Sequence, residues 1–198
     1  MINEKRAAEI YRKTKETEVK IHLNLDGAGR VDLNTGVPFL EHMLDLFAKH
    51  GGFDLTIAAT GDLQVDEHHT VEDIAICLGQ AFNQALNVKE GINRYGLSIV
   101  PMDEALGQVV VDISNRPHLE YRITLPDKRI GAFPSELFRE FLWKFALEAR
   151  ITLHAEVLYG LNSHHMIEAV FKALGRSLRQ AISLNPQQIG VPSSKGVL

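Results

Sequence analysis

The residues of this chain best suited to chemistry are two adjacent histidine pairs, each followed by a glutamate at the same spacing. On a helix, residues three or four positions apart lie side by side, so each glutamate neighbours both histidines of its pair. Adjacent residues point about 100° apart around the helix axis, so the two histidines of one pair do not easily reach one ion. The two sets are His68, His69 and Glu72, and His164, His165 and Glu168.

These two sets predict a centre of two metal ions, with each helix giving a ligand to both. Imidazole combined with carboxylate suits manganese, iron or zinc better than calcium or magnesium. No cysteine lies among these ligands, so nothing indicates a closed zinc site of the thiolate kind. A single His-His pair at a helix start is more often a capping or surface feature. Two pairs in register, each with its glutamate, favour metal binding.

Two further histidines are candidates to complete the ligand shells. His42 falls on a predicted helix, and His154 falls in the strand predicted just before the second histidine pair. Either one alone would more often be an ordinary half-buried histidine. We interpret His22, His50 and His118, which have no partner in the repeat described next, as structural or surface residues.

The chain contains an internal repeat. A shift of 96 residues aligns the two His-His-x-x-Glu sets, with seven identities over the 19 positions that begin at His68. Upstream the shift becomes 99, because the second half is three residues shorter in the loop before its histidine pair. Chance matching of two amphipathic helices does not usually reproduce such a set, so we predict duplication of a half-domain. The pairs aligned upstream are Gly61 with Gly160, Glu41 with Glu140, His42 with Phe141 and Leu55 with His154.

Hydrophobic periodicity predicts the elements of each half. In the first half, a strand over 17–25 and a short strand near 30–33 would form a hairpin around the turn 26–29. The remaining expected elements are a helix over 39–47 that Gly51-Gly52 ends, a strand over 53–60 and a helix over 68–85. The second half has strands over 109–113, 119–125 and 151–158 and helices over 136–149 and 164–182.

This order predicts an α+β fold of tandem duplicated half-domains, each a mostly antiparallel sheet with helices on one face. We expect residues 1–198 to form a single domain of two fused repeats, about 1–95 and 96–198. The tail 190–198 is expected to be irregular.

Composition excludes several classes of function. The net charge is −4 and the pI about 6.1, so no basic field indicates nucleic-acid binding. One cysteine among 198 residues fits a reducing, cytoplasmic setting. The N-terminus lacks the apolar core of a signal peptide, and no apolar run approaches the length of a membrane span.

Motifs along nearly the whole chain resemble those of the imidazoleglycerol-phosphate dehydratase family. The most specific are Asp66-Glu67-His68-His69-Thr70-Val71-Glu72-Asp73 and Asn162-Ser163-His164-His165-Met166-Ile167-Glu168-Ala169. The departures are mild, since Pro38 and Glu41 stand where a glycine and an aspartate are common. The other matching segments are 12–17, 36–44, 61–63, 101–106, 116–117, 153–154, 170–173 and 192–196.

The resemblance implies two Mn(II) ions per active site, each bound by three histidines and one glutamate. It also implies a fold similar to the second domain of ribosomal protein S5. A large octahedral homo-oligomer (24-mer) is expected as well, with active sites between subunits. The implied metal ligands are His42, His68, His69, Glu72, His154, His164, His165 and Glu168.

The implied reaction is the dehydration of D-erythro-imidazoleglycerol phosphate to imidazole acetol phosphate in histidine biosynthesis. Two ions on the two ring nitrogens would stabilise an imidazolate, and loss of the hydroxyl would leave a diazafulvene-like intermediate. The resemblance points to Glu16 as the base, although beside Lys13 and Lys15 it also fits a solvated surface glutamate. The implied substrate ligands are Glu16, Arg94, Arg116, Lys172, Ser193, Ser194 and Lys195.

Local spacing gives the phosphate site some independent support. Lys172, Arg176 and Arg179 have helical spacing on the helix that begins with the second histidine pair. For Arg176 and Arg179 we prefer a solvated basic face. The tail that carries Lys195 is expected to close over the substrate as a lid.

Two other classes of function remain open at the level of sequence. A two-metal hydrolase of phosphate esters would use similar histidine and glutamate sites, and it would release free phosphate. A metal-binding or RNA-binding module without enzymatic activity would give no product, and the negative net charge disfavours RNA.

Overall fold

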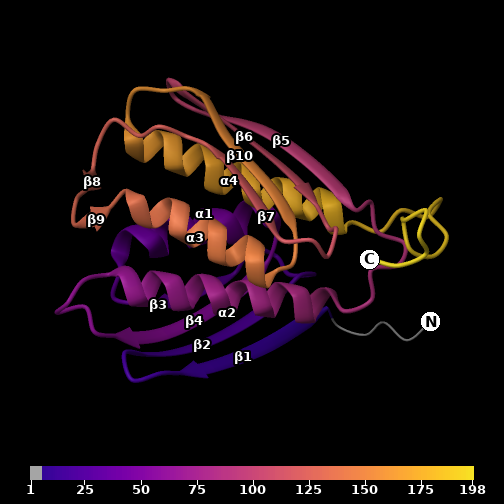
Figure 1. Ribbon diagram of the computed structural model, residues 1–198, viewed down its shortest axis with the longest axis horizontal. Coiled ribbons are helices and arrows are strands. Elements are labelled where there is room, and N and C mark those ends of the chain that lie inside the picture. Colours follow the sequence, from indigo (N-terminus) through magenta and orange to yellow (C-terminus); the bar gives the residue numbers. More distant parts are fainter. Residues whose placement is uncertain (1–5) are drawn as a thin grey trace.

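The computed structural model describes residues 6–198. The first five residues, on which part of the expectation about signal peptides rests, lie outside the described range. Over residues 6–198, four helices lie between two four-stranded sheets, with one sheet on each outer side (Figure 1). None of the helices in this range is both long and apolar enough to cross a bilayer.

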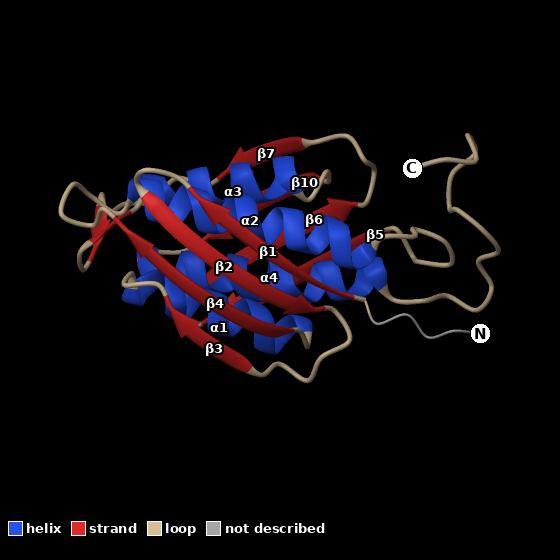
Figure 2. Cartoon of the chain, turned by 90° about the horizontal axis from the view of Figure 1, so that it is seen from below, coloured by secondary structure: helices blue, strands red, loops and turns tan. Residues whose placement is uncertain are grey.

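The first half forms one sheet and two helices. Its strand order is β1-β2-β4-β3, and all neighbours are antiparallel except β3 and β4, which are parallel. Figure 2 shows this sheet nearly face on, in front of the helices. The elements are β1 (Ala7–Lys13), β2 (Thr17–Asn24), β3 (Val31–Asn34), α1 (Pro38–Gly51), β4 (Asp54–Gly61) and α2 (His68–Leu86).

The second half repeats this topology. Its sheet has the order β5-β6-β10-β7, again with one parallel pair, β7 and β10, at the edge. A two-stranded addition, β8 with β9, precedes α3. The duplicated α+β fold is therefore confirmed. The elements are β5 (Tyr95–Met102), β6 (Ala105–Asp112), β7 (His118–Arg122), β8 (Arg129–Ile130), β9 (Phe133–Pro134), α3 (Glu136–Glu148), β10 (Thr152–Tyr159) and α4 (Ser163–Ile182).

One expected pairing is wrong. The strand near residues 30–33 does not close a hairpin with 17–25. Instead β3 runs parallel to β4, with Val31 opposite Leu55, while β2 lies between β1 and β4. The turn after β2 therefore leads the chain across the end of β4 to the far edge of the sheet.

Strands β1 and β5 were not predicted, and both lie at sheet edges. On β1 only Ala8 is buried. On β5 the outward residues Tyr95, Leu97 and Ile99 are themselves apolar and exposed. Neither strand therefore shows the alternation of apolar and polar residues that identifies a half-buried strand.

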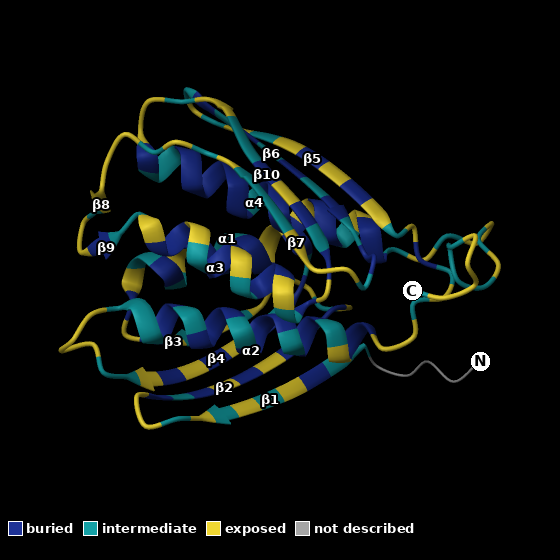
Figure 3. Ribbon diagram, viewed as in Figure 1, coloured by how far each residue is buried: buried dark blue, intermediate teal, exposed yellow. Residues whose placement is uncertain are grey.

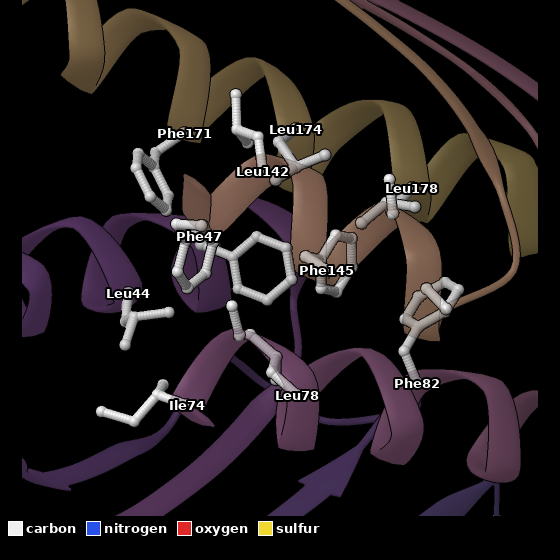
Figure 4. Close-up of a cluster of buried hydrophobic side chains, with 14 of the residues drawn as sticks. Leu44, Phe47, Ile74, Leu78, Phe82, Leu142, Phe145, Phe171, Leu174 and Leu178 are labelled. Atoms are coloured by element: carbon white, nitrogen blue, oxygen red, sulfur yellow. The ribbon is translucent and has the colours of Figure 1, made fainter. Parts of the chain in front are cut away.

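The core lies between the sheets and includes residues from both halves. Alternate residues of each central strand point inward, so buried and exposed bands alternate along the strands (Figure 3). At its centre, the ring of Phe145 on α3 lies 6.2 Å from that of Phe47 on α1 and 6.0 Å from that of Phe82 on α2 (Figure 4). The halves thus share one hydrophobic core.

Two glycines that match in the repeat allow the helices to pack closely. A Cβ atom on Gly79 of α2 would lie 2.8 Å from the backbone oxygen of Phe145, and one on Gly175 of α4 would clash with the backbone oxygen of Phe47. The pairs α2 with α3 and α1 with α4 therefore meet through their backbones. This close approach explains why both halves carry glycine at this place.

We expect Gly175→Ala to destabilise the protein. In an isolated helix this change would stabilise by up to about 1 kcal/mol, but the added methyl group must push α1 away from α4. Overpacking of this kind costs about 1–3 kcal/mol. Chemical denaturation measures the loss, and Arg176→Ala, at an exposed neighbouring position, is the control. A gain in stability would show that the helices can separate without cost.

Candidate metal centre and active site

The two His-His helices begin at the same end of the molecule (Figure 1). In α4, the side chain of Asn162 accepts hydrogen bonds from the backbone N–H groups of His164 (2.8 Å) and His165 (3.3 Å). In α2, Asp66 accepts a hydrogen bond from the N–H of His68 (2.8 Å). A polar residue two positions before each pair thus satisfies free N–H groups of the first turn and fixes where the histidines project.

The first cluster joins α1 to α4. His42, His164 and Glu168 each place one ligand atom within 4.8 Å of the others. The Nε2 atoms of the two histidines lie 3.4 and 3.3 Å from Glu168 Oε2, and Lys172 Nζ lies 2.6 Å from Oε1. Burial opposes the charge on Glu168, but the hydrogen bond and charge of Lys172, with His42, lower its pKa overall. A buried carboxylate therefore stays ionised beside two imidazoles.

The second cluster joins α2 to α3 and occupies the equivalent place in the fold. His68, Glu72 and Glu140 place their ligand atoms within 4.8 Å of one another. The ammonium group of Lys144 contacts both carboxylates, 2.7 Å from Glu72 and 3.4 Å from Glu140. This hydrogen bond to Glu72 raises the pKa of Lys144. Sequence reasoning missed Glu140.

The second histidine of each pair is held by a carboxylate. Nδ1 of His69 lies 3.0 Å from Asp62, and Nδ1 of His165 lies 2.8 Å from Glu104. These hydrogen bonds raise the pKa of both histidines, and the bond to His165 helps to lower the pKa of Glu104 to about 2. Because Nδ1 is engaged, the ring orientation is fixed and Nε2 is the atom that can bind a metal ion.

Glu16 lies close to the first of these carboxylates. It is exposed in the turn between β1 and β2, and its backbone oxygen accepts a hydrogen bond from the N–H of Asp62 (3.1 Å). Glu104 has the same position in the second half, directly before β6 as Glu16 is directly before β2. The two glutamates have diverged, since Glu104 holds His165 while Asp62 holds His69. The side chain of Glu16 is thereby available for another role.

The residues expected to bind phosphate fall in two places. Lys172 belongs to the first cluster. Arg94 and Arg116 instead contact Asp112, at 2.7 and 3.3 Å. Arg94 also donates a 2.8 Å hydrogen bond to the backbone oxygen of Pro192, so it holds the tail.

The tail itself forms a short turn beyond this point. Lys195 N–H donates to Ser193 Oγ (3.2 Å), and Ser194 is exposed between them. The tail lies at the opposite end of the molecule from the first residues of α2 and α4 (Figure 1). Within one chain it therefore does not cover the metal clusters as a lid.

His154 is not brought to either cluster. It is exposed on β10, between the buried residues Leu153 and Ala155, and so faces away from the helices. Its ring is 6.1 Å from that of His118, centroid to centroid. The full set of eight ligands named from the sequence stays a prediction, and no contact in residues 6–198 links His154 to the other seven.

The structure also corrects the alignment of the halves. The buried positions of α1 and α3 match at a separation of 98 residues, not 99, which places His42 opposite Glu140. A register irregularity between Val157 and Tyr159 in β10 adds one residue, so the separation of 99 holds only after it, for Gly61 and Gly160. The matching buried positions are Leu40, Met43, Leu44, Phe47 and Ala48 with Phe138, Phe141, Leu142, Phe145 and Ala146.

Comparisons with known proteins identify the family of this chain. The family model for imidazoleglycerol-phosphate dehydratase matches residues 35–178. The enzymes of that name from Bacillus licheniformis and Bacillus subtilis are 61% and 60% identical over 193 residues, which cover 98% of this chain and the whole of each relative.

Solved structures give the same result. The Staphylococcus aureus dehydratase superimposes with a TM-score of 0.83 at 40% identity, over 90% of this chain and 99% of that one. The Pyrococcus furiosus enzyme, in complex with (S)-C348, gives 0.82 at 40% identity, over 96% and 100%. The chain belongs to the imidazoleglycerol-phosphate dehydratase family and is a dehydratase, a lyase of histidine biosynthesis.

Proposed function

We propose that the chain dehydrates D-erythro-imidazoleglycerol phosphate to imidazole acetol phosphate on a pair of Mn(II) ions. The observation that carries the proposal is the presence of two clusters of imidazole and carboxylate groups at equivalent places in the two halves. Their donor atoms converge within 4.8 Å, and such mixed donors suit Mn(II). The Lys144 ammonium group between two carboxylates supports a preference for positive charge at the second cluster.

The ligands divide by their geometry. His42, His164 and Glu168 would hold one ion, and His68 with Glu72 would contribute to the other. His69 and His165 lie outside both clusters, with Nδ1 bound to a carboxylate. Their Nε2 atoms would reach ions shared with neighbouring subunits. The place of His154 in this set stays a prediction.

When bound, the ions supply Lewis acidity that stabilises negative charge on the imidazole ring of the substrate. After the ring N–H proton has passed to solvent, the electrons of the ring would expel the neighbouring hydroxyl group, which would leave as water with a proton from solvent and give a diazafulvene-like species. In the proposed mechanism Glu16 removes the proton from the side-chain carbon, and the resulting enol tautomerises to the ketone. The exposure of Glu16 next to the Asp62–His69 pair supports this role.

The phosphate would be bound by cations from two chains. Lys172 lies midway along α4, beside Glu168 of the first cluster, whereas Arg94, which with Arg116 contacts Asp112, lies at the C-terminal end of that helix and holds Pro192, next to the Ser193–Lys195 turn. In this proposal a second subunit supplies the cations that one chain does not bring to its own first cluster. Arginine and lysine are suited to phosphate, and Ser193 and Ser194 would add hydroxyl donors.

This separation supports assembly into an octahedral 24-mer with active sites between subunits. The outward face of the edge strand β5 carries Tyr95, Leu97 and Ile99, each about half exposed, and an apolar strip of this kind favours burial against another chain. A cytoplasmic location is part of the same proposal, since the single cysteine, Cys77, is buried and free.

The test incubates purified protein with Mn(II) and imidazoleglycerol phosphate, with chelator-treated protein as the control. We expect the dehydrated keto-phosphate, and we expect chelation to abolish its formation. Release of free phosphate would instead identify a hydrolase, and binding without any product would identify a module that is not an enzyme.

A further inference from the structure

We propose that Asp73 is a positioning residue, which ties the turn that carries Glu16 to helix α2. The inference rests on the proposed role of Glu16 as the base, and it names the contact that sets where this base lies. Asp73 directly follows Glu72 in the chain, but its side chain is buried and is bound by residues of β1 and β2.

The carboxylate of Asp73 accepts hydrogen bonds from both strands that flank the turn. The Thr17 hydroxyl on β2 donates to one oxygen, and Nε of Arg12 on β1 donates to the other at 2.8 Å. Thr17 and Asp73 are only 4% and 6% exposed. Hydrogen bonds to an ionised group are about twice as strong as those between neutral groups. These two contacts therefore resist movement of the turn relative to α2.

The turn is also fixed internally, so Glu16 moves with Thr17. The Thr14 hydroxyl accepts hydrogen bonds from the N–H groups of Glu16 (3.1 Å) and Thr17 (2.9 Å). The backbone oxygen of Glu16 accepts a hydrogen bond from the N–H of Asp62, whose carboxylate holds His69. Holding Thr17 on α2 thus fixes Glu16 relative to His69, which lies on the same helix.

The second half has apolar residues at the equivalent place. A Cβ atom on Gly61 would meet Thr17, and one on Gly160 would meet Ala105. Because these two glycines are aligned in the repeat, Ala105 is the equivalent of Thr17. The shift of 96 that aligns the histidine pairs, and the pairing of each first strand with the second, give the other equivalents, which are Ala169 for Asp73 and Val100 for Arg12.

The polar contact is therefore not a requirement of the fold. Alanine and valine side chains form no hydrogen bonds, yet the second half folds with the same topology. Replacing a buried ion pair by apolar groups is often neutral or stabilising, so stability alone does not account for the contact either.

The difference between the halves coincides with the state of the glutamate in each turn. Glu104 is held by its own hydrogen bond to His165, at 2.8 Å. Within residues 6–198, no hydrogen bond holds the carboxylate of Glu16, so its position depends on the backbone of the turn. The buried anchor thus occurs in the half whose glutamate needs one.

The test compares Thr17→Val with Thr17→Ser in the full-length protein loaded with Mn(II). Valine keeps the size of the side chain but removes the hydroxyl, whereas serine keeps the hydroxyl. We expect Thr17→Val to lower kcat by about 10- to 100-fold, because a small misplacement of a reacting group has effects of this size. Manganese content should not change, and Thr17→Ser should retain most of the activity.

A triple variant copies the second half and serves if Thr17→Val fails to fold. It combines Arg12→Val, Thr17→Ala and Asp73→Ala, which leaves no unpaired buried charge, and it should show the same loss of kcat with full manganese content. Ser177→Ala is the control, because it removes another buried hydroxyl, which donates to the backbone oxygen of Leu174 on α4. This control should leave kcat unchanged.

A double-mutant cycle separates positioning from a general structural effect. If the anchor acts through Glu16, the triple variant combined with Glu16→Gln is no slower than Glu16→Gln alone, because no base is left to position. Losses that multiply, loss of manganese from the triple variant, or full activity of the folded triple variant would overturn this inference alone. Full activity of Glu16→Gln would overturn the proposed role of Glu16 and the inference with it.

Discussion

Glu16→Gln is expected to abolish turnover while leaving the metal content unchanged. Glutamine keeps the size of the side chain but cannot accept the proton. Loss of a general base costs about 10²- to 10⁴-fold in rate. The backbone oxygen of Glu16 accepts a hydrogen bond from the N–H of Asp62, while its carboxylate acts on His69 through charge and helps to raise the pKa of that histidine, so the fold should not change. Steady-state kinetics give kcat, and elemental analysis gives the bound manganese.

The matched control is Glu18→Gln, two residues further along. Glu18 is partly exposed, and its carboxylate is bound by Tyr11 (2.8 Å) and Lys13 (2.7 Å) on the outside of the sheet. This variant should keep its activity. If Glu16→Gln were fully active, Glu16 would be removed from the mechanism, and if it lost manganese as well, Glu16 would be a ligand.

The sequence predicts those helices and strands in which one face is buried and the other is exposed to solvent. Strand β2 shows a clear period of two residues because Val19, Ile21 and Leu23 point inward and the polar residues between them point outward. Strand β5 breaks this rule, since its outer residues are also apolar. Because the outer face of β5 is apolar, no polar residues alternate with the inner ones, and periodicity alone does not identify the strand.

The sequence likewise predicts only some of the residues of the site. Spacing along a helix predicts the neighbours of His68 and His164, because that geometry is local. Glu140 and Glu104 reach the site through tertiary packing, and the identity of Glu41 and Glu140 in the sequence suggested the wrong alignment. The irregularity in β10 adds one residue, so the separation of 99 between the halves holds only after it. The packing of α3, which lies before it, shows that the separation there is 98.

The family resemblance names the phosphate-binding residues but not their arrangement. Lys172 lies midway along α4 beside Glu168, whereas Arg94 lies at the C-terminal end of that helix, where its backbone N–H donates to the backbone oxygen of Ala181. A list of residues in one chain contains no information about which chain supplies each of them. The arrangement in space therefore adds an argument for assembly that the sequence lacks.

The second large effect is expected from Glu168→Ala. Only 8% of this side chain is exposed, and it is the one residue of the first cluster that contacts both histidines and Lys172. Since changes that only reorient metal ligands cost about 10- to 100-fold, loss of a central ligand should cost more. We expect one ion per chain to be lost, together with measurable turnover, and elemental analysis and the product assay test both.

The same change should also destabilise the metal-free protein. Lys172, whose side chain is 15% exposed, would lose its carboxylate partner, and an unpaired buried polar group costs about 1–3 kcal/mol. Adding Lys172→Met to Glu168→Ala removes the unpaired charge and should restore part of the free energy of unfolding, but not the ion. Such a result separates the two roles of Glu168, because ion pairing can be replaced by apolar packing while metal coordination cannot. Full manganese occupancy in Glu168→Ala would contradict the assignment of the first cluster.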